Sequence, residues 1–467
     1  MKRRIVILGG GLAGLSAAFE LSKNPQNNVV VLEKEKEAGG LARTINYKNF
    51  FFEFGPHRFF TKNTFIENLV KDLLGDELRI VNRQTRIFFE GKFFNYPPTF
   101  SDTIKLGYGQ AAKIFLDYLW VRIKSLLRKP KIRTLKDAYI DQFGKSLYQL
   151  FFEDFSEKLW GLPTSQISAD WAIQRTKKMS ITKILKEMIF KKREVVSLVD
   201  KFYFPKKGIG RISERLAEEI IKKGGEILTQ ADVLEINING KKIESVEFKL
   251  KGERKTIKGD FFISSLPINL FIKMLLPAPP PKILSTTERL RFRDLVLVNL
   301  IINQRNFSQD HWLYTQGKGI CNRIIQPKNF SKGLVPDKRK TSLSAEYTIW
   351  ENEKISDKEF IVKTIKTITE TLGFIKKEKI LDAFVLRAHQ TYPLYDLGYK
   401  KNLTLLKKYL AGFNNLQTIG RAGLFRYNNM DHSILSGIYA ARNIEGADYD
   451  LDKINLDQEY LEEKREK

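Results

Sequence analysis

Residues 3–14, RRIVILGGGLAG, decide the fold of this chain. The apolar run in this stretch predicts a buried strand, and the turn that follows carries glycines in the spacing Gly9-x-Gly11-x-x-Gly14. The first glycine permits a tight bend, the second lets the backbone approach a pyrophosphate, and the third lets a helix pack closely on the strand. The predicted helix over 15–21 also begins with amide groups and a dipole that favour phosphate. The stretch therefore predicts a dinucleotide site.

A second buried strand follows that helix. Its sequence, NVVVLE over 28–33, ends on Glu33, 19 residues after Gly14. A carboxylate there can accept hydrogen bonds from ribose hydroxyls and disfavours a 2′-phosphate, so NAD and FAD fit this site better than NADP. The order of strand, glycine turn, helix and strand predicts a parallel, doubly wound α/β sheet, and Leu12 and Ala13 at the helix start are further candidate cofactor contacts.

The composition predicts a folded protein of several domains. Of the 467 residues, 42% are hydrophobic and 12% aromatic, which allows a large core and excludes a wholly disordered chain. The net charge of +26 suits an anionic partner such as a phosphate, a nucleic acid or an acidic membrane face, and a lysine-rich composition alone produces it equally well. Because no DNA- or RNA-recognition pattern is found, we expect no nucleic-acid partner.

The metal-ligating residues are sparse. The single cysteine, Cys321, allows no internal disulfide, and the four histidines are far apart in the sequence. We therefore expect no metal site, and chemistry that comes from an organic cofactor or from acid–base side chains. The sequence opens on a strand rather than on a signal-peptide pattern, and it holds no apolar run of about 18 residues. These features predict a cytoplasmic protein.

The pattern of elements predicts two interleaved domains. Residues 1–62, 206–266 and 410–446 read as a discontinuous Rossmann-like domain of strands and short helices. Residues 63–205 and 267–409 read as an inserted α+β substrate domain, whose first part is helical, as in the periodic stretch 111–130, and whose second part contains a sheet. We expect residues 447–467 to form a charged C-terminal tail.

A second glycine turn narrows the choice of cofactor. The stretch EKEKEAGGLART, residues 33–44, places Gly39, Gly40, Leu41 and Arg43 shortly after the ribose carboxylate, where a turn and an arginine can clamp a pyrophosphate that continues into a flavin. This pattern resembles the flavin amine-oxidase superfamily, which includes amine oxidases, protoporphyrinogen oxidase and UDP-galactopyranose mutase. The resemblance implies FAD as the cofactor.

The end of the chain is similar to the same superfamily. The stretch LQTIGRAGLFRYNNMDHSILSGIYAARNI, residues 416–444, resembles the segment that closes the sheet and turns a helix N-terminus toward the flavin. In addition, ADVLEINI, residues 231–238, resembles the strand beside the adenine. The resemblance implies that the following residues contact the cofactor: Val233, Gly420, Arg421, Met430, Asp431 and Ile434.

Three further stretches resemble UDP-galactopyranose mutase. FFEFGPHRFFT, residues 51–61, implies that Gly55, Pro56 and His57 lie at the flavin ring. GKSLYQLFFEDFSEKLWG, residues 144–161, implies that Trp160 stacks on a uracil base. CNRIIQPKNF, residues 321–330, is similar to the segment that carries a substrate-side arginine, here Arg323.

This resemblance implies a mutase that acts on a nucleotide-linked sugar. Its chemistry is covalent catalysis by reduced flavin, without net oxidation. His57, Arg323 and Tyr427 are the catalytic candidates, and the substrate-binding candidates are Trp160, Arg175, Tyr347, Tyr392 and Tyr395. The sequence departs from the mutase pattern at Phe425 and Asn428, where that family carries tyrosines, and a phenylalanine cannot donate to a phosphate.

An oxidoreductase is the alternative. The stretch FYFPKKGIGRISERLAEEI, residues 202–220, looks more like protoporphyrinogen oxidase, and in such an enzyme hydride passes from the substrate to the flavin. Residues 122–136 hold seven basic residues and no acid beside an apolar stretch. This segment either packs within the inserted domain or rests on an anionic membrane at the inner face and admits a lipid-soluble substrate. The oligomeric state is left open.

Overall fold

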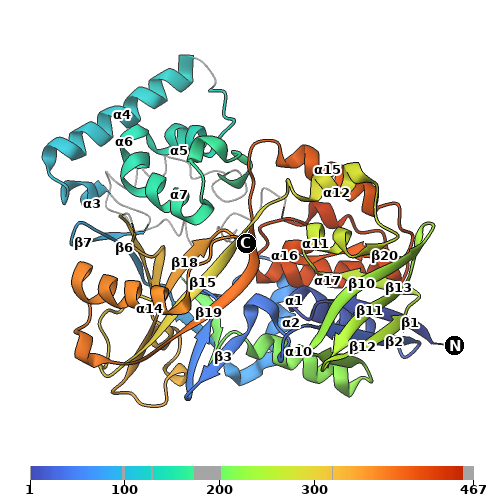
Figure 1. Ribbon diagram of the computed structural model, residues 1–467. Coiled ribbons are helices and arrows are strands. Elements are labelled where there is room, and N and C mark those ends of the chain that lie inside the picture. Colours follow the sequence, from blue (N-terminus) through green and yellow to red (C-terminus); the bar gives the residue numbers. More distant parts are fainter. Residues whose placement is uncertain (1, 97–99, 128–129, 173–200, 318, 456–467) are drawn as a thin grey trace.

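The first layer of the fold is a five-stranded parallel sheet in the order β20-β13-β1-β2-β9. The structure is a computed structural model, and it describes residues 2–96, 100–127, 130–172, 201–317 and 319–455. The strands of this sheet are Arg3–Leu8 (β1), Asn27–Glu33 (β2), Glu226–Thr229 (β9), Phe261–Ser264 (β13) and Leu416–Thr418 (β20). The chain thus returns to one sheet from its beginning, middle and end, as Figure 1 shows on the right.

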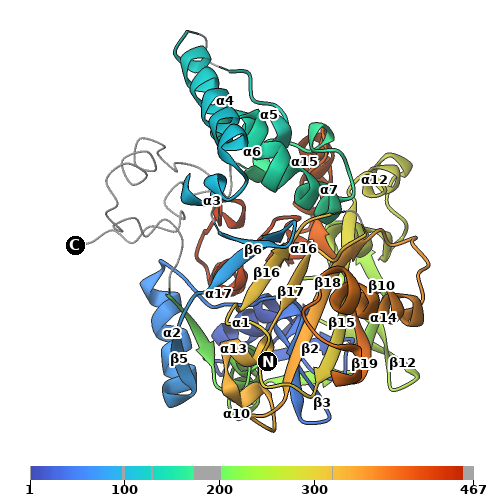
Figure 2. The same cartoon turned by 90° about the vertical axis from the view of Figure 1, so that its left-hand side faces the viewer.

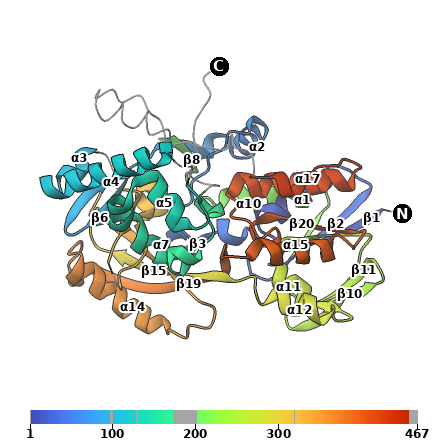
Figure 3. The same cartoon turned by 90° about the horizontal axis from the view of Figure 1, so that it is seen from above.

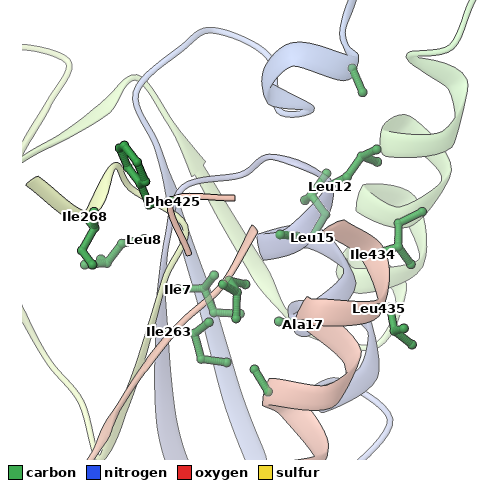
Figure 4. Packing of buried hydrophobic residues seen from close by; sticks show 14 of the residues in the cluster. Ile7, Leu8, Leu12, Leu15, Ala17, Ile263, Ile268, Phe425, Ile434 and Leu435 are labelled. Atoms are coloured by element: carbon green, nitrogen blue, oxygen red, sulfur yellow. The ribbon is translucent and has the colours of Figure 1, made fainter. Parts of the chain in front are cut away.

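Helices pack on this sheet through small and apolar side chains. Helix α1 (Leu12–Leu21) lies between α17 (Met430–Ile444) and α10 (Arg211–Lys222), and α10 in turn contacts α2 (Thr64–Leu74). Figure 4 shows Ile7 of β1 next to Ile263 of β13, and Leu15 of α1 and Ile434 of α17 belong to the same buried hydrophobic cluster. A Cβ on Gly437 of α17 would lie 2.1 Å from the Ala13 carbonyl oxygen, so the two helices cross almost backbone to backbone.

A second, mostly antiparallel sheet borders the first, in the order β12-β11-β10-β14. Its strands are Ala231–Asn239 (β10), Lys242–Leu250 (β11), Glu253–Lys258 (β12) and Leu275–Leu276 (β14). The short helices nearby are Ile268–Lys273 (α11), Pro281–Thr287 (α12), Tyr399–Leu410 (α15) and Gly420–Gly423 (α16).

The third sheet has seven strands and forms the body on the left of Figures 1 and 3, in the order β19-β15-β18-β17-β16-β6-β7. Its pairs are antiparallel except for β16 and β6, which are parallel. The strands are Thr85–Phe89 (β6), Lys92–Asn95 (β7), Phe292–Ile302 (β15), Trp312–Thr315 (β16), Arg323–Ile325 (β17), Thr341–Ile349 (β18) and Ile380–Pro393 (β19). Helix α14 (Asp357–Lys366) packs on one face, and the other face looks toward the site.

Two small antiparallel pairs and a helical group complete the fold. The pairs are Thr44–Tyr47 (β3) with Phe50–Glu53 (β4), and Leu78–Asn82 (β5) with Lys201–Pro205 (β8). The helical group, at the top of Figures 1 and 2, comprises Phe100–Ile104 (α3), Tyr108–Leu127 (α4), Leu135–Phe143 (α5), Lys145–Tyr148 (α6) and Asp154–Trp160 (α7).

The remaining helical segments are short. Pro327–Phe330 (α13) is one α-helical turn, Gln149–Glu153 and Thr367–Thr371 are π-helical, and the 3₁₀ turns are Gly40–Ala42, Gly75–Glu77, Thr164–Gln166, Lys332–Leu334, Lys377–Lys379 and Leu451–Lys453.

The architecture confirms the predicted fold class, a parallel doubly wound sheet with a further α+β part. The helix predicted over 15–21 begins earlier, at Leu12, because the glycine turn leads straight into it. The strand β12 was not anticipated, since its sequence ERKTIK is largely charged and exposed on a sheet edge. Within the described ranges, every helix is too short or too polar to cross a bilayer.

Candidate functional site

The two glycine turns lie against each other at the carboxyl edge of the parallel sheet. The Gly39 N–H donates to the Gly10 carbonyl over 2.7 Å, and a Cβ on Gly40 would lie 3.1 Å from the Gly11 Cα. A Cβ on Gly14 would lie 1.9 Å from the Gly9 carbonyl oxygen, so only glycine allows α1 to start this close to β1. The turns therefore present bare backbone beside the start of α1, as an approaching pyrophosphate requires.

Glu33 ends β2 beside this backbone surface. Its carboxylate accepts hydrogen bonds from the Gly10 N–H (2.8 Å) and the Glu35 N–H (2.9 Å). Burial raises the pKa of this carboxyl, and the two backbone hydrogen bonds oppose that shift. The strand β10 starts close by, because the Gln230 N–H donates to the Glu35 carbonyl over 3.0 Å, and Val233 is buried on this strand.

Arg43 and Leu41 follow the second glycine turn. The Arg43 Nε donates to the Gly40 carbonyl over 3.0 Å, and its Nη1 lies 3.1 Å from a Glu35 carboxylate oxygen. The guanidinium also lies 5.3 Å from the Phe54 ring centroid. These contacts hold the arginine at the turn, and Leu41 is half-buried beside it.

The C-terminal segment closes the same surface. Gly420 has a φ of +75°, and a Cβ there would lie 3.0 Å from the Ala13 Cβ. Its N–H donates to the Ser436 hydroxyl over 3.1 Å, which ties the turn to α17. Met430 is the first residue of α17, and Asp431 and Ile434 are buried in its first turns. Three stretches that are far apart in the sequence thus meet around the start of α1.

The loop after β4 connects this surface to the seven-stranded sheet. Gly55 has a φ of +122°, and a Cβ there would lie 3.6 Å from a carboxylate oxygen of Glu346 on β18. Pro56 and His57 follow it, and the His57 N–H donates to the Gly55 carbonyl over 2.8 Å. This tight turn holds the imidazole between the two sheets.

His57 is a neutral imidazole in this environment. Burial lowers its pKa to about 3, and the charges of Arg421 and Arg323 act in the same direction. Its Nδ1 is buried and has no hydrogen-bond partner among the residues that the structure describes. A buried, unsatisfied ring nitrogen is costly, so its position fits a hydrogen bond to a bound molecule.

Arg323 and Glu346 face each other across β17 and β18. The Arg323 Nη2 lies 2.6 and 2.7 Å from the two carboxylate oxygens, and 3.4 Å from the Tyr392 hydroxyl. Glu346 is fully buried. Burial acts to lower the pKa of Arg323, but the carboxylate outweighs it and raises the pKa well above the usual value. The arginine is therefore charged, and its charge is neutralised within the protein.

Aromatic side chains and a second arginine surround this pair. The Tyr392 and Tyr427 rings stack with centroids 5.8 Å apart and an interplanar angle of 7°. Trp160 lies edge-on to both tyrosines, at 6.3 and 6.4 Å. The Arg421 guanidinium lies 4.7 Å from the Tyr427 centroid and donates to the Asn428 carbonyl. Within the described chain Arg421 has no acidic partner. Its charge, unlike the charge of Arg323, is therefore not neutralised.

Trp160 is more enclosed than a residue that stacks on a base would be. Its side chain is fully buried, among neighbours that include Trp171 and the two stacked tyrosines. Its Nε1 has no hydrogen-bond partner in the part of the chain that the structure describes. In this arrangement Trp160 offers no open ring face to a base.

Two predicted substrate residues lie elsewhere. Tyr347 follows Glu346 on β18, and because successive strand residues point to opposite faces, its hydroxyl meets Thr364 (2.9 Å) beneath α14. Its assignment to the substrate site is therefore corrected. Tyr395 is buried behind the site, where its hydroxyl accepts the Tyr427 N–H over 2.9 Å, so it supports a site residue. Arg175 lies outside the described residues.

The sequence analysis missed Glu346 and Tyr314. Tyr314 on β16 lies close enough to Arg323 to influence its pKa. The signal for Glu346 was present, since it is the single acid in the otherwise uncharged strand TSLSAEYTI. A buried strand carries a charged residue only where that residue has a partner, which is Arg323 here.

The described residues contain no cluster of three or more His, Cys, Asp or Glu side chains suited to a metal ion.

The residues present fit FAD. Bare glycine backbone lies at the helix start, a ribose-type carboxylate ends β2, and the unsatisfied His57 nitrogen lies beyond them toward the other sheet.

Solved structures share the whole fold. A reduced UDP-galactopyranose mutase superposes with a TM-score of 0.84 over 97% of this chain and 96% of that chain, at 18% identity. A provisional protoporphyrinogen oxidase of Exiguobacterium sp. 255-15 superposes with a TM-score of 0.72 over 95% of this chain and 99% of that one, also at 18% identity.

Sequence relatives match over shorter stretches. L-amino-acid oxidase of Crotalus adamanteus is 39% identical over 69 residues, 15% of this chain and 13% of that protein. Coproporphyrinogen III oxidase of Bacillus subtilis is 35% identical over 89 residues, 18% of this chain and 19% of that protein. The chain thus matches less than a fifth of the length of each of these relatives.

The family comparison covers nearly the whole chain. The sequence model described as "Flavin containing amine oxidoreductase" matches residues 12–444. Because this match runs from the end of the first glycine turn through the second glycine turn, the His57 loop and the C-terminal segment, the chain belongs to the flavin containing amine oxidoreductase family and is an FAD-dependent enzyme.

Proposed function

We propose that this enzyme acts on a nucleotide-linked sugar, as a UDP-galactopyranose mutase does. The observation that carries the proposal is the group of Tyr392, Tyr427, Arg421 and Arg323 next to His57. Stacked aromatic rings suit a nucleotide base, and arginines with tyrosine hydroxyls suit a diphosphate. The shared fold with the reduced mutase supports the proposal.

The proposed cofactor contacts belong to the three converging stretches. Gly9 to Gly14, with Gly39, Gly40 and Arg43, would hold the pyrophosphate, Glu33 the ribose, and Val233 the adenine side. Gly420, Arg421, Met430, Asp431 and Ile434 would lie along the flavin, with Gly55, Pro56 and His57 at its ring. FAD, when bound and reduced, supplies an electron-rich centre that can attack a sugar carbon. We likewise propose that residues 1–62, 206–266 and 410–446 act as the FAD-binding domain.

The two arginines have different proposed roles. Glu346 already neutralises Arg323, so Arg323 offers directed N–H groups and little net charge. Arg421 lies over the Tyr427 ring and is held by the Asn428 carbonyl, so it supplies the positive charge that a diphosphate needs. The neutral His57 would donate or accept a hydrogen bond at its free Nδ1 without adding charge.

Trp160 takes a supporting place in this proposal. Because its ring is fully buried, the base would lie on Tyr427, which is half-buried, while Trp160 backs the tyrosine pair. Tyr395 would hold the Tyr427 backbone from the other side.

A hydride-transferring oxidoreductase is the second candidate. The local sequence matches to L-amino-acid oxidase and coproporphyrinogen III oxidase favour it. In that case the same aromatic and arginine residues would orient a carboxylate-bearing substrate at the flavin, and oxygen or another acceptor would take the electrons.

Turnover of UDP-sugars by the flavin-loaded enzyme separates the two candidates. The assay is run with and without dithionite reduction while oxygen is monitored. Isomerisation only after reduction, without oxygen uptake, supports the mutase. Flavin bleaching by an amino acid or a porphyrinogen, followed by reoxidation in air, supports the oxidoreductase and contradicts the mutase.

Variants then locate the reaction at the proposed site. Tyr427→Phe keeps the ring but removes the hydroxyl, so mutase kcat/KM should fall by about tenfold or more. Tyr347→Phe is the matched control, because Tyr347 points to the opposite face of the sheet and should keep normal kinetics.

A further inference from the structure

Helix α4 carries an apolar stripe on the side that faces solvent. The side chains of this stripe are all exposed: Phe115, Leu116, Leu119, Trp120, Ile123 and Leu127. Leu116 is 63% exposed and Trp120 66% exposed, and such side chains are informative because they are neighbours in one apolar patch. The residues recur at spacings of three and four, so they share one side of the helix along its length. The sequence of α4 is therefore apolar on a side that the described residues leave uncovered.

The opposite side of α4 is the one that packs on the protein. Ala111 and Ile114 are buried there. The Asp117 carboxylate accepts the Ser146 N–H over 3.0 Å at the start of α6, which fixes the helix to its neighbours. Because this side already holds α4 in place, the exposed stripe is not needed for packing within the described residues. Figure 2 shows α4 projecting from the top of the molecule.

Basic residues border the stripe. Lys113 and Lys124 are exposed on α4, and Lys131 and Arg133 are exposed just beyond its end. Between residues 122 and 136 the sequence has seven basic residues and no acid. The one acid of α4, Asp117, is on the packed side. An apolar stripe with an exclusively basic edge is complementary to a bilayer whose head groups are anionic.

We propose that α4 docks flat on an anionic phospholipid surface, with its apolar stripe among the acyl chains and its basic edge at the head groups. Trp120 and Tyr108, both exposed, are residues that favour this boundary. A second copy of the chain fits less well, because a two-fold contact would bring the basic edges of two strongly positive molecules together. The proposal does not depend on the reaction that the enzyme catalyses.

Vesicle co-sedimentation of the flavin-loaded full chain tests the proposal. Wild-type protein should sediment with vesicles that contain about a third phosphatidylglycerol and remain in solution with pure phosphatidylcholine, and high salt should reduce binding. The double variant Leu116→Ser/Trp120→Ser should bind at least about fivefold less, and so should Lys113→Glu/Lys124→Glu. These side chains are exposed, so both variants should keep the wild-type melting temperature and flavin content.

Matched controls lie on other helices. Ile221→Ser on α10 removes an apolar side chain that is 60% exposed, and Lys358→Glu on α14 reverses an exposed charge; both should bind vesicles as wild type does. Failure of wild type to bind anionic vesicles, or equal binding by the stripe variants, overturns the proposal. So does a concentration-dependent dimer that Leu116→Ser/Trp120→Ser abolishes without vesicle binding, or a large loss of melting temperature in that variant, since either shows that protein covers the stripe.

Discussion

Arg323 and Glu346 form a buried ion pair at the proposed substrate site, and this pair changes what each residue can do. The Glu346 carboxylate has no exposed surface, while the Arg323 side chain is 15% exposed. A buried charge whose partner is removed costs far more than the pair gains by forming. The carboxylate therefore stabilises the arginine and at the same time limits the charge that a substrate can meet.

Glu346→Gln should separate these two effects. We expect the variant to lose about 3 kcal/mol of stability, because a buried guanidinium loses its counter-charge. We also expect it to bind UDP more tightly, because Arg323 then meets the diphosphate with its full charge. Denaturant unfolding and UDP titration measure the two quantities. A variant whose affinity for UDP falls along with its stability would show that Arg323 does not face the diphosphate.

His57 should make the stability of the protein depend on pH in one direction. Its pKa in the fold is about 3, whereas an unfolded histidine titrates near 6.5, so between these values only the unfolded chain takes up the proton. Stability contributed by the neutral imidazole is present above about pH 6.5 and falls as the pH is lowered. Relative to His57→Gln, wild type should lose about 2 kcal/mol between about pH 7.5 and 5. Parallel unfolding curves at both pH values would mean that His57 takes up its proton in the fold as it does in the unfolded chain.

At the scale of elements, one buried carboxyl links β4 to the loop before α10. Glu53 accepts the Ile209 N–H over 2.7 Å and a weaker hydrogen bond from the Thr44 hydroxyl (3.4 Å). Burial raises the pKa of Glu53 to about 8, and these hydrogen bonds reduce the shift. The protonated acid is therefore the form that the fold favours at neutral pH.

Glu53→Gln should show the opposite pH trend to His57→Gln. The raised pKa gives stability that is present below about pH 4.5 and is lost as the pH rises through about 8. Between about pH 6 and 7.5, wild type should lose about 2 kcal/mol relative to Glu53→Gln, whose amide does not titrate. Urea midpoints at the two pH values measure this difference. A difference between wild type and Glu53→Gln that stays the same at the two pH values would show an ionised Glu53 in the fold.

The crossing of α1 and α17 should tolerate no added side-chain atom. Gly437→Ala places a Cβ about 2.1 Å from the Ala13 carbonyl oxygen, so the helices must move apart. We expect a loss of about 2 kcal/mol and weaker flavin retention, because α1 carries the phosphate-binding turn. Gly109→Ala on α4 is the control, since nothing lies within 4 Å of its added Cβ, and its melting temperature should not fall. Equal effects of the two changes would contradict the tight crossing.

At the scale of the whole molecule, local signals in the sequence predict the fold class and a dinucleotide site, while the choice of FAD rests on the resemblance of residues 33–44 and 416–444 to the flavin amine-oxidase superfamily. The turn of Gly9, Gly11 and Gly14 and the carboxylate of Glu33 each carry a backbone or charge requirement that can be recognised without a structure. The strand β12 lacks such a signal, since its charged residues resemble a loop until the sheet edge that they form is seen.

The substrate side was harder to predict, because it depends on which face of the seven-stranded sheet each residue occupies. Tyr347 and Glu346 are neighbours, and the register of β18 against β15 and β17 decides that only Glu346 reaches the site. No local pattern reports this register, and none reports the enclosure of Trp160 by Tyr392 and Tyr427. These features arise from contacts between strands and helices that are distant in the sequence.

Titration of the flavin-loaded enzyme with UDP, followed through the flavin absorbance, tests the proposed nucleotide-sugar site most directly. We predict a saturable spectral change whose affinity falls by about tenfold or more in Tyr427→Ala and is unchanged in Tyr347→Phe. A spectrum that does not respond to UDP at millimolar concentration, together with flavin bleaching by an amino acid or a porphyrinogen, would contradict the account.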